Sequence, residues 1–524
     1  MTATCRSKRG RNRRPDVLQR PRGLIHPRVQ KVGAEHFGIV AVDCAKARSK
    51  WMLTDFWGNV LLPPAVVEHT RAGFDAAVAG LRQAIRERDI RDLLVAVERT
   101  GRYHHAPARA LASAGFETRT VHPFTTKQFR RPADPGNKTD DTDLAAICRA
   151  AINGFALVEP SLDESWRQFQ LLTRHRRDLV RKASILCCQI KEHLEAALPG
   201  YAACFPTLWD HPAAMILALR VGGAEAIKQA SVVRLRDLLT KAGVGFQQRT
   251  LDRVRQWADA AACPDVAASG HRRIAADLEA DRQRKELEIQ GLEREIAQML
   301  VRTPYVLLMS IPGINVVSAS EYAAEMGPIC NYANARCITG RAGLYPSRHQ
   351  SDQVDFSGPM VKCANRRLRF ALMQIADNLI TCNHYFAKLA SGWRVAKTDP
   401  RLIRVRVAMR FSRISFQMVA GATVFNHPAA RQRDYILQKL ITFHHQHQTS
   451  AHQVQHDLQH ASMQLPPGEC AAEARPLQEE LTKIVENRRR GPQPLGEILP
   501  ALLAGLAARV VQSPPSGAGQ PHVR

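Results

Sequence analysis

Apolar and polar positions along the first third of the chain follow the patterns of strands and helices in turn. Residues 37–43 and 92–98 are near-continuous apolar runs, each ending in a carboxylate, which is typical of strands covered on both faces. Three strands followed by alternating helices and strands predict an α/β domain with a mixed sheet over residues 35–158. The other elements expected there are strands at 50–55, 60–68 and 117–121 and helices at 70–88, 103–114 and from 139 onward.

The pattern after this domain is mostly helical. Apolar residues recur at spacings of three and four over 169–198 and 274–300, which predicts two long helices. These helices either pair as a coiled coil, within or between chains, or pack inside one helical domain. We therefore expect a helical, coiled-coil region over residues 159–300 and a mostly α-helical domain over 301–432.

The two ends of the chain have a different composition. Residues 1–34 are rich in Lys and Arg without apolar periodicity, which predicts a disordered basic arm. Residues 433–524 form a tail that is first His- and Gln-rich and then Pro-rich. Within it, His452, His456 and His460 have helical spacing for a metal site, but no acidic or Cys partner is evident and the surrounding glutamines favour compositional bias.

Charge narrows the class of partner. The 524 residues include 74 Lys and Arg against 48 Asp and Glu, a net charge of +26, so we expect nucleic acid as the partner. No apolar run is long enough for a spanning helix, and the N-terminus lacks a signal-peptide core. A cytoplasmic protein, associated with the nucleoid when bound to DNA, is expected. Twelve cysteines without a C-x-x-C motif fit reduced thiols better than disulfides or a zinc site.

The candidate chemistry centres on the acidic stretch at residues 138–143, which opens a predicted helix. By itself this stretch is a good N-terminal cap, because acids in a first turn complement the helix dipole. Asp140 and Asp143 are three residues apart and share a face, whereas Asp141 points elsewhere.

Two further carboxylates complete a candidate metal site. Asp43 and Glu98 end the two buried strands, and strand ends of an open α/β sheet face its ligand crevice. With Asp140 and Asp143 they would form an oxygen ligand set suited to Mg²⁺ or Mn²⁺. Two such ions can assist an in-line phosphoryl transfer.

The chain resembles the DEDD-type insertion-sequence transposases, the bridge-RNA-guided serine recombinases related to Piv-like DNA invertases. The resemblance extends over about residues 36–430 in the order of the family's motifs. The motifs that carry it are Val42-Asp43-Cys44-Ala45-Lys46, Glu98-Arg99-Thr100-Gly101-Arg102-Tyr103, Lys138-Thr139-Asp140-Asp141-Thr142-Asp143, Ile311-Pro312-Gly313-Ile314, Gly343-Leu344-Tyr345-Pro346, Gln350-Ser351 and Lys362-Cys363-Ala364-Asn365-Arg366-Arg367-Leu368-Arg369.

This resemblance implies a fold and a mechanism. The N-terminal domain is expected to be RuvC-like (RNase H-like), with the four carboxylates as its metal-binding tetrad. The C-terminal transposase domain is expected to hold a nucleophilic serine that forms a phosphoserine link to DNA. Ser351 matches by its spacing of eleven residues to Lys362 and is favoured over Ser357. The family's serine is followed by Gly, whereas Asp352 follows here, and its charge would repel a DNA phosphate.

The implied partners are double-stranded DNA, a non-coding guide RNA and further copies of this chain, as a dimer or tetramer. A Pro-Gly turn at residues 311–314 either presents amides to a phosphate or simply connects two helices. The candidate nucleic-acid contacts are Arg174, Arg177, Arg181, Lys182, Lys362, Arg366 and Arg369.

Two other functions stay open at this point. A RuvC-like nuclease would use the tetrad for simple hydrolysis, and a catalytically inactive relative would only bind nucleic acid. A serine hydrolase is disfavoured because no G-x-S-x-G elbow is present.

Overall fold

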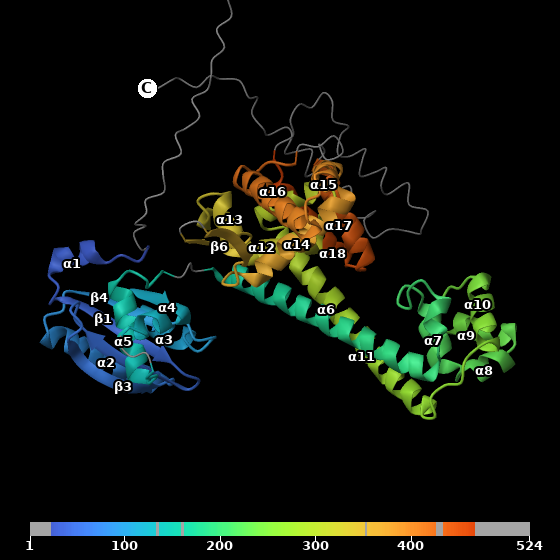
Figure 1. Cartoon of the computed structure of the whole chain (residues 1–524), viewed down its shortest axis with the longest axis horizontal. Coiled ribbons are helices and arrows are strands. Elements are labelled where there is room, and N and C mark those ends of the chain that lie inside the picture. The colour runs from blue at the N-terminus through green and yellow to red at the C-terminus, as the bar shows by residue number, and fades with distance from the viewer. Residues whose placement is uncertain (1–21, 133–135, 159–161, 352–353, 426–432, 467–524) are drawn as a thin grey trace, which may run out of the picture. The chain divides into compact units, whose positions relative to one another are not determined.

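The computed structural model describes residues 22–132, 136–158, 162–351, 354–425 and 433–466 (Figure 1). The chain divides into two compact units, residues 1–161 and 162–524. No helix within the described residues is long and apolar enough to cross a membrane.

The first unit is a five-stranded mixed sheet with helices on both faces. Strand order is β3-β2-β1-β4-β5; β1 pairs antiparallel with β2 and parallel with β4. The strands are β1 (Phe37–Cys44), β2 (Arg48–Thr54), β3 (Val60–Glu68), β4 (Asp92–Glu98) and β5 (Thr118–Val121). The helices are α1 (His26–Val32), α2 (Arg71–Glu87), α3 (His105–Ser113), α4 (Pro123–Arg130) and α5 (Asp140–Ile152). The predicted α/β domain with a mixed sheet is confirmed.

Alternation along β1 and β4 divides the core into two layers. Ile39 and Ala41 pack on the same side as α5, whereas Val40 and Val42 pack against α2 and α3. Both sets are fully buried, as expected for strands covered on both faces.

Helix α1 corrects the predicted basic arm. Ile25 and Val29 are buried in the core of the sheet unit, and the amide of Gly23 donates to the carbonyl of Gly154. The prediction of disorder through residue 34 is therefore wrong for residues 23–33, because two apolar side chains anchor a helix too short to show a period. Residues 1–21 lie outside the described part of the chain.

The second unit begins with the two predicted long helices. Helices α6 (Glu164–Ala197) and α11 (Ala268–Leu300) pack along each other within the chain (Figure 1). Each is about 50 Å long at 1.5 Å per residue. Between them in sequence lies a small helical module with its own core, made of η1 (Tyr201–Cys204), α7 (Pro212–Arg220), α8 (Ala224–Gln229), α9 (Val232–Lys241) and α10 (Gln248–Asp259).

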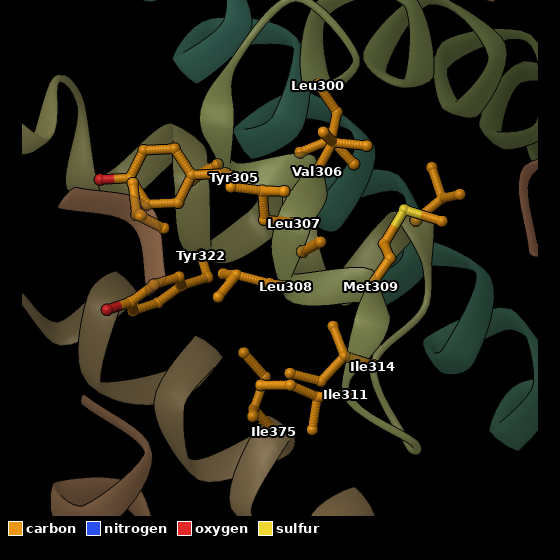
Figure 2. Packing of buried hydrophobic residues seen from close by; sticks show 14 of the residues in the cluster. Leu300, Tyr305, Val306, Leu307, Leu308, Met309, Ile311, Ile314, Tyr322 and Ile375 are labelled. Carbon is orange, nitrogen blue, oxygen red and sulfur yellow. The ribbon is translucent and has the colours of Figure 1, made fainter. Parts of the chain in front are cut away.

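The C-terminal part of this unit packs around a buried 3₁₀ helix, η2 (Pro304–Ser310). Figure 2 shows its Tyr305–Met309 side chains meeting Tyr322 and Ile375 from neighbouring helices. The surrounding elements are α12 (Val316–Met326), η3 (Ile329–Asn331), α13 (Ala335–Ala342), β6 (Pro346–Ser351), β7 (Val354–Met360), α14 (Arg366–Cys382), α15 (His384–Val395), α16 (Pro400–Ala420), α17 (Arg433–Gln446) and α18 (Ala451–Gln464).

Helices α17 and α18 belong to the core of the second unit, which contradicts the predicted separate tail from residue 433. Ile436, Leu440 and Leu458 are buried in the same core as η2. Lys439 extends from α17 to the carbonyls of Met309, Ile311 and Ile314, at 2.7, 3.0 and 2.7 Å. The predicted boundary at 432 is therefore wrong for α17 and α18, the second of which ends at residue 464. Composition alone did not show the apolar stripe of these helices, because their other faces are rich in Gln and His.

Candidate active site

The sheet places Asp43 and Glu98 side by side. They follow Val42 and Val97, which are paired residues on the parallel neighbours β1 and β4. By the two-residue period of a strand, Asp43 lies on the same face as Ala41 and Glu98 on the same face as Ala96. Both carboxylates therefore lie on the face that α5 covers.

Helix α5 brings the other two carboxylates to this face. Thr139 is its N-cap and forms a capping box with Thr142, with the two hydroxyls bonding the opposite backbone amides at 3.2 and 3.0 Å. Asp140 and Asp143 occupy the first turn, and Asp143 is buried. The cap interpretation and the carboxylate-site interpretation are thus compatible, since the capping is done by threonine hydroxyls.

The charges of these four side chains interact. Burial and then the carboxylates of Glu98, Asp143 and Asp140 raise the pKa of Asp43 to about 6. Burial is the larger cause of this shift, and the three carboxylates add to it because they lie close enough to repel the charge of Asp43. The structure therefore brings Asp43, Glu98, Asp140 and Asp143 into one electrostatic cluster.

Asp141, between two of these carboxylates in sequence, is not part of the cluster. Its side chain is exposed and forms an ion pair with Lys50 of β2, at 2.6 Å. This agrees with the predicted outward orientation.

Two neighbours already bind cluster members. Arg130, at the end of α4, forms an ion pair with Asp143, and the Thr100 hydroxyl donates to Glu98 at 3.1 Å. As these side chains stand, no group of three or more His, Cys, Asp or Glu within the described residues is arranged to hold a metal ion. The chemistry of the donor set nevertheless fits a hard divalent cation, because all four side chains supply carboxylate oxygens and three of them lie close enough to Asp43 to raise its pKa.

Arg130 was missed by the sequence reasoning. It lies thirteen residues before Asp143 on a different helix, and no spacing rule links the two positions. Its role follows only from the packing of α4 against α5.

Ser351 lies in a different unit, on a β-hairpin. It ends β6 and pairs in register with Val354 of β7, and it is exposed. Asp352, whose charge raised the question of activity, lies outside the described residues.

Three of the seven candidate basic contacts have partners inside the protein. Arg174 forms a bidentate pair with the buried Glu325, at 2.7 and 3.0 Å. The guanidinium of Arg177 stacks 3.4 Å from the ring centroid of Phe370. Arg369 donates to the carbonyls of Ala342 and Val361.

These contacts stabilise the fold, so the prediction that they bind nucleic acid is weakened. The other four candidates, Arg181, Lys182, Lys362 and Arg366, are exposed and remain candidates.

The structure describes the surroundings of two features whose role the sequence left open, the three-histidine stripe and the Pro-Gly turn. His456 contacts Asp457 and Arg302, and His460 bonds to the carbonyl of His456. Within the described residues no group of three or more His, Cys, Asp or Glu is arranged to hold a metal ion, and these histidines are no exception. In the Pro-Gly turn, the Pro312 carbonyl accepts from Asn383 at 3.2 Å, and the flanking carbonyls bond to Lys439 as described above. These contacts fix the carbonyls of the turn, and both interpretations of its amides stay predictions.

Comparisons with known proteins agree with this organisation. The model of the DEDD-type IS110 proteins, described as "Transposase", matches residues 40–199, and that described as "Transposase IS116/IS110/IS902 family" matches residues 305–391. The first match contains the four-carboxylate cluster, and the second contains Ser351. The two matches thus fit a transposase with an α/β domain that carries the four carboxylates and a helical C-terminal domain that carries Ser351.

The chain belongs to the IS110 family of DEDD transposases, enzymes that process DNA. A probable family 20 transposase of Pseudomonas aeruginosa is 24% identical over 356 residues, covering 66% of this chain and 91% of the relative. A protein of insertion element IS116 from Streptomyces clavuligerus, described as uncharacterized, is 25% identical over 385 residues, covering 70% and 92%. A transposase for insertion sequence element IS1328 of Yersinia enterocolitica is 22% identical over 326 residues, covering 62% and 82%.

Proposed function

We propose that this transposase recombines double-stranded DNA through the nucleophile Ser351, assisted by divalent cations bound to Asp43, Glu98, Asp140 and Asp143. The observation that carries the proposal is the electrostatic cluster of four carboxylates on one face of the sheet. Such a cluster is costly unless cations neutralise it. A RuvC-like fold fits the order and directions of the five strands.

The residues suggest how the cations would be held. Asp43 and Glu98 come from rigid neighbouring strands, and Asp140 and Asp143 from a capped first helical turn. Mg²⁺ or Mn²⁺ bound there would stabilise charge on the attacking and leaving oxygens of a phosphate. Arg130 would have to release Asp143, or share it, when a cation binds.

The serine step is a phosphoryl transfer. The Ser351 Oγ forms a bond to phosphorus as its proton leaves, and the bond from phosphorus to the 3′ oxygen breaks. The products are a 5′-phosphoserine and a free 3′-hydroxyl, which can later reverse the step on another strand. A serine hydroxyl needs activation for this attack, and its exposure on a hairpin leaves it accessible to DNA.

The choice of DNA sites is proposed to rest on a non-coding guide RNA, with the chain acting as a homo-oligomer. The net charge of +26 supports contacts to a large amount of phosphate backbone. The exposed residues Arg181, Lys182, Lys362 and Arg366 are the candidate contacts.

A strand-transfer assay tests the mechanism. The full chain would be incubated with Mg²⁺, a candidate guide RNA and donor and target plasmids, and covalent complexes would be trapped in SDS. We expect S351A to lose both transfer and the covalent complex, on the order of 10³-fold or more. D140N should lose both as well, whereas S357A, the rival serine, should keep them.

The alternatives give different results. Transfer that survives S351A but not S357A would move the nucleophile to Ser357. DNA hydrolysis that persists in S351A and disappears in D140N, without any covalent complex, would favour a RuvC-like nuclease. Transfer without the RNA would refute guidance, and a wild-type chain that binds DNA without cleaving it would support an inactive relative.

A further inference from the structure

A groove lies between helices α15 and α16, apart from the carboxylate cluster and Ser351. The two helices pack against each other in the C-terminal part of the second unit (Figure 1). The groove is an open surface hollow with a volume of about 420 Å³. Its lining residues are Tyr385, Leu389, Trp393, Arg406, Met409, Arg410 and Arg413.

Helix α16 contributes the positive charge of the groove. Arg406, Arg410 and Arg413 are spaced by four and three, so they line one face of the helix, and all three are exposed. No carboxylate is among the lining residues, and no ion pair joins these arginines to a carboxylate within the described residues. Three positive charges therefore share one small concavity without internal neutralisation.

Helix α15 contributes flat aromatic surfaces. Tyr385, Leu389 and Trp393 are spaced by four and face the arginines. The guanidinium of Arg406 lies 5.6 Å from the Trp393 ring centroid, and that of Arg410 lies 5.9 Å from the Tyr385 centroid. The Arg410 Nε also donates to the Tyr385 hydroxyl at 2.9 Å. These contacts hold alternating aromatic and guanidinium planes in place.

We propose that this groove binds an unpaired nucleotide of a single-stranded nucleic acid, with the base on Trp393 or Tyr385 and the phosphate on Arg413. Aromatic faces stack on bases regardless of their identity, and arginines beside them neutralise the backbone. In a duplex the base faces are already stacked and cannot reach side chains within a groove. The chemistry is shared by single-stranded RNA and DNA.

This site deepens the proposed function, on which it rests for its biological setting. Binding at the groove can nevertheless be measured without any cleavage or transfer. A loss of strand transfer in S351A and a loss of single-strand binding in groove variants are therefore independent outcomes.

The experiment compares groove variants of the full chain by fluorescence anisotropy. The probes are labelled 12-nucleotide RNA, the same sequence as DNA, and the DNA duplex, each in EDTA over a series of salt concentrations. We expect W393A to weaken binding of at least one single strand on the order of tenfold. W393F, which keeps an aromatic face, should restore most of it, and duplex binding should change less than twofold.

The arginine variant tests the phosphate contact. R413A should weaken single-strand binding and lower the slope of log affinity against log salt by about 0.7. K388A removes a charge from an exposed position on α15 outside the groove and is the matched control. Ultraviolet crosslinking followed by peptide mapping should place the oligonucleotide on the peptide containing Tyr385 or Trp393.

Several results would overturn the proposal. The first is that W393A and R413A bind single strands as tightly as the wild type does. The second is that K388A loses as much single-strand affinity as R413A. The third is that the groove variants lose as much duplex affinity as single-strand affinity. Melting curves exclude misfolding of W393A, and a W393F variant as weak as W393A would refute stacking. The difference between the RNA and DNA arms identifies which strand occupies the groove.

Discussion

Replacing Asp43 with Asn should stabilise the metal-free protein at pH 8. Burial and the neighbouring carboxylates raise the pKa of Asp43 from 3.8 to about 6, so its charged form is disfavoured in the folded state. A group with a raised folded pKa contributes its stability below pH 3.8, and that contribution is lost as the pH rises through about 6. At pH 8 the charged carboxylate is therefore a liability that the Asn variant removes.

The size of the effect follows from the difference between the two pKa values. About two pH units correspond to about 3 kcal/mol, and the partial exposure of Asp43 reduces this to about 1–2 kcal/mol. The sign should reverse when Mg²⁺ is added, since a cation that binds only the folded state stabilises the wild type more than the variant.

Hydrogen exchange of peptides covering β1 and β4, followed by mass spectrometry, measures this difference locally. Wild type and D43N would be compared at pH 8 in EDTA and in Mg²⁺. D141N is the matched control, because Asp141 is exposed and paired with Lys50, and it should change protection by less than about 0.5 kcal/mol. If D43N were no better protected than wild type in EDTA, the four carboxylates would not be crowded as described.

Three further substitutions test other contacts. R130A removes the competing partner of Asp143, so calorimetric titration should show Mg²⁺ binding tighter by about tenfold; weaker binding would mean that the arginine helps to hold the site. R174A should lower the free energy of unfolding by about 3 kcal/mol in denaturant titrations, because the buried Glu325 loses its charged partner and keeps the amide of Asn365. K182A should leave the free energy of unfolding within about 0.5 kcal/mol and weaken nucleic-acid binding instead. G343A should cost about 1–3 kcal/mol, because φ is +63° there and a Cβ would meet neighbouring side chains, and an unchanged melting temperature would contradict this.

The local elements of the α/β unit follow from sequence. Short apolar runs such as 37–43 are typical of strands covered on both faces, and a terminal acid on such a run indicates a functional edge. The N-terminal signal at Thr139 placed the start of α5 correctly, because capping depends on neighbouring residues alone. These features depend on interactions within a few residues of the chain.

Ion-pair and hydrogen-bond partners that are distant in sequence are set by the tertiary structure. Arg174 and Lys182 read alike as basic residues on a helix, yet only the fold pairs Arg174 with Glu325, 151 positions away. The same holds for Lys439, whose helix looked like part of a biased tail, whereas its ammonium donates to the carbonyls of Met309, Ile311 and Ile314.

The sequence by itself determined the four carboxylates as candidate ligands and the two buried strands that end in Asp43 and Glu98. Only the tertiary structure showed that Arg130 already binds Asp143 and that three arginines share a groove with two aromatic rings. The reason is physical: residue type and period report on local geometry, whereas the charge that a side chain faces is set by whichever element packs against it.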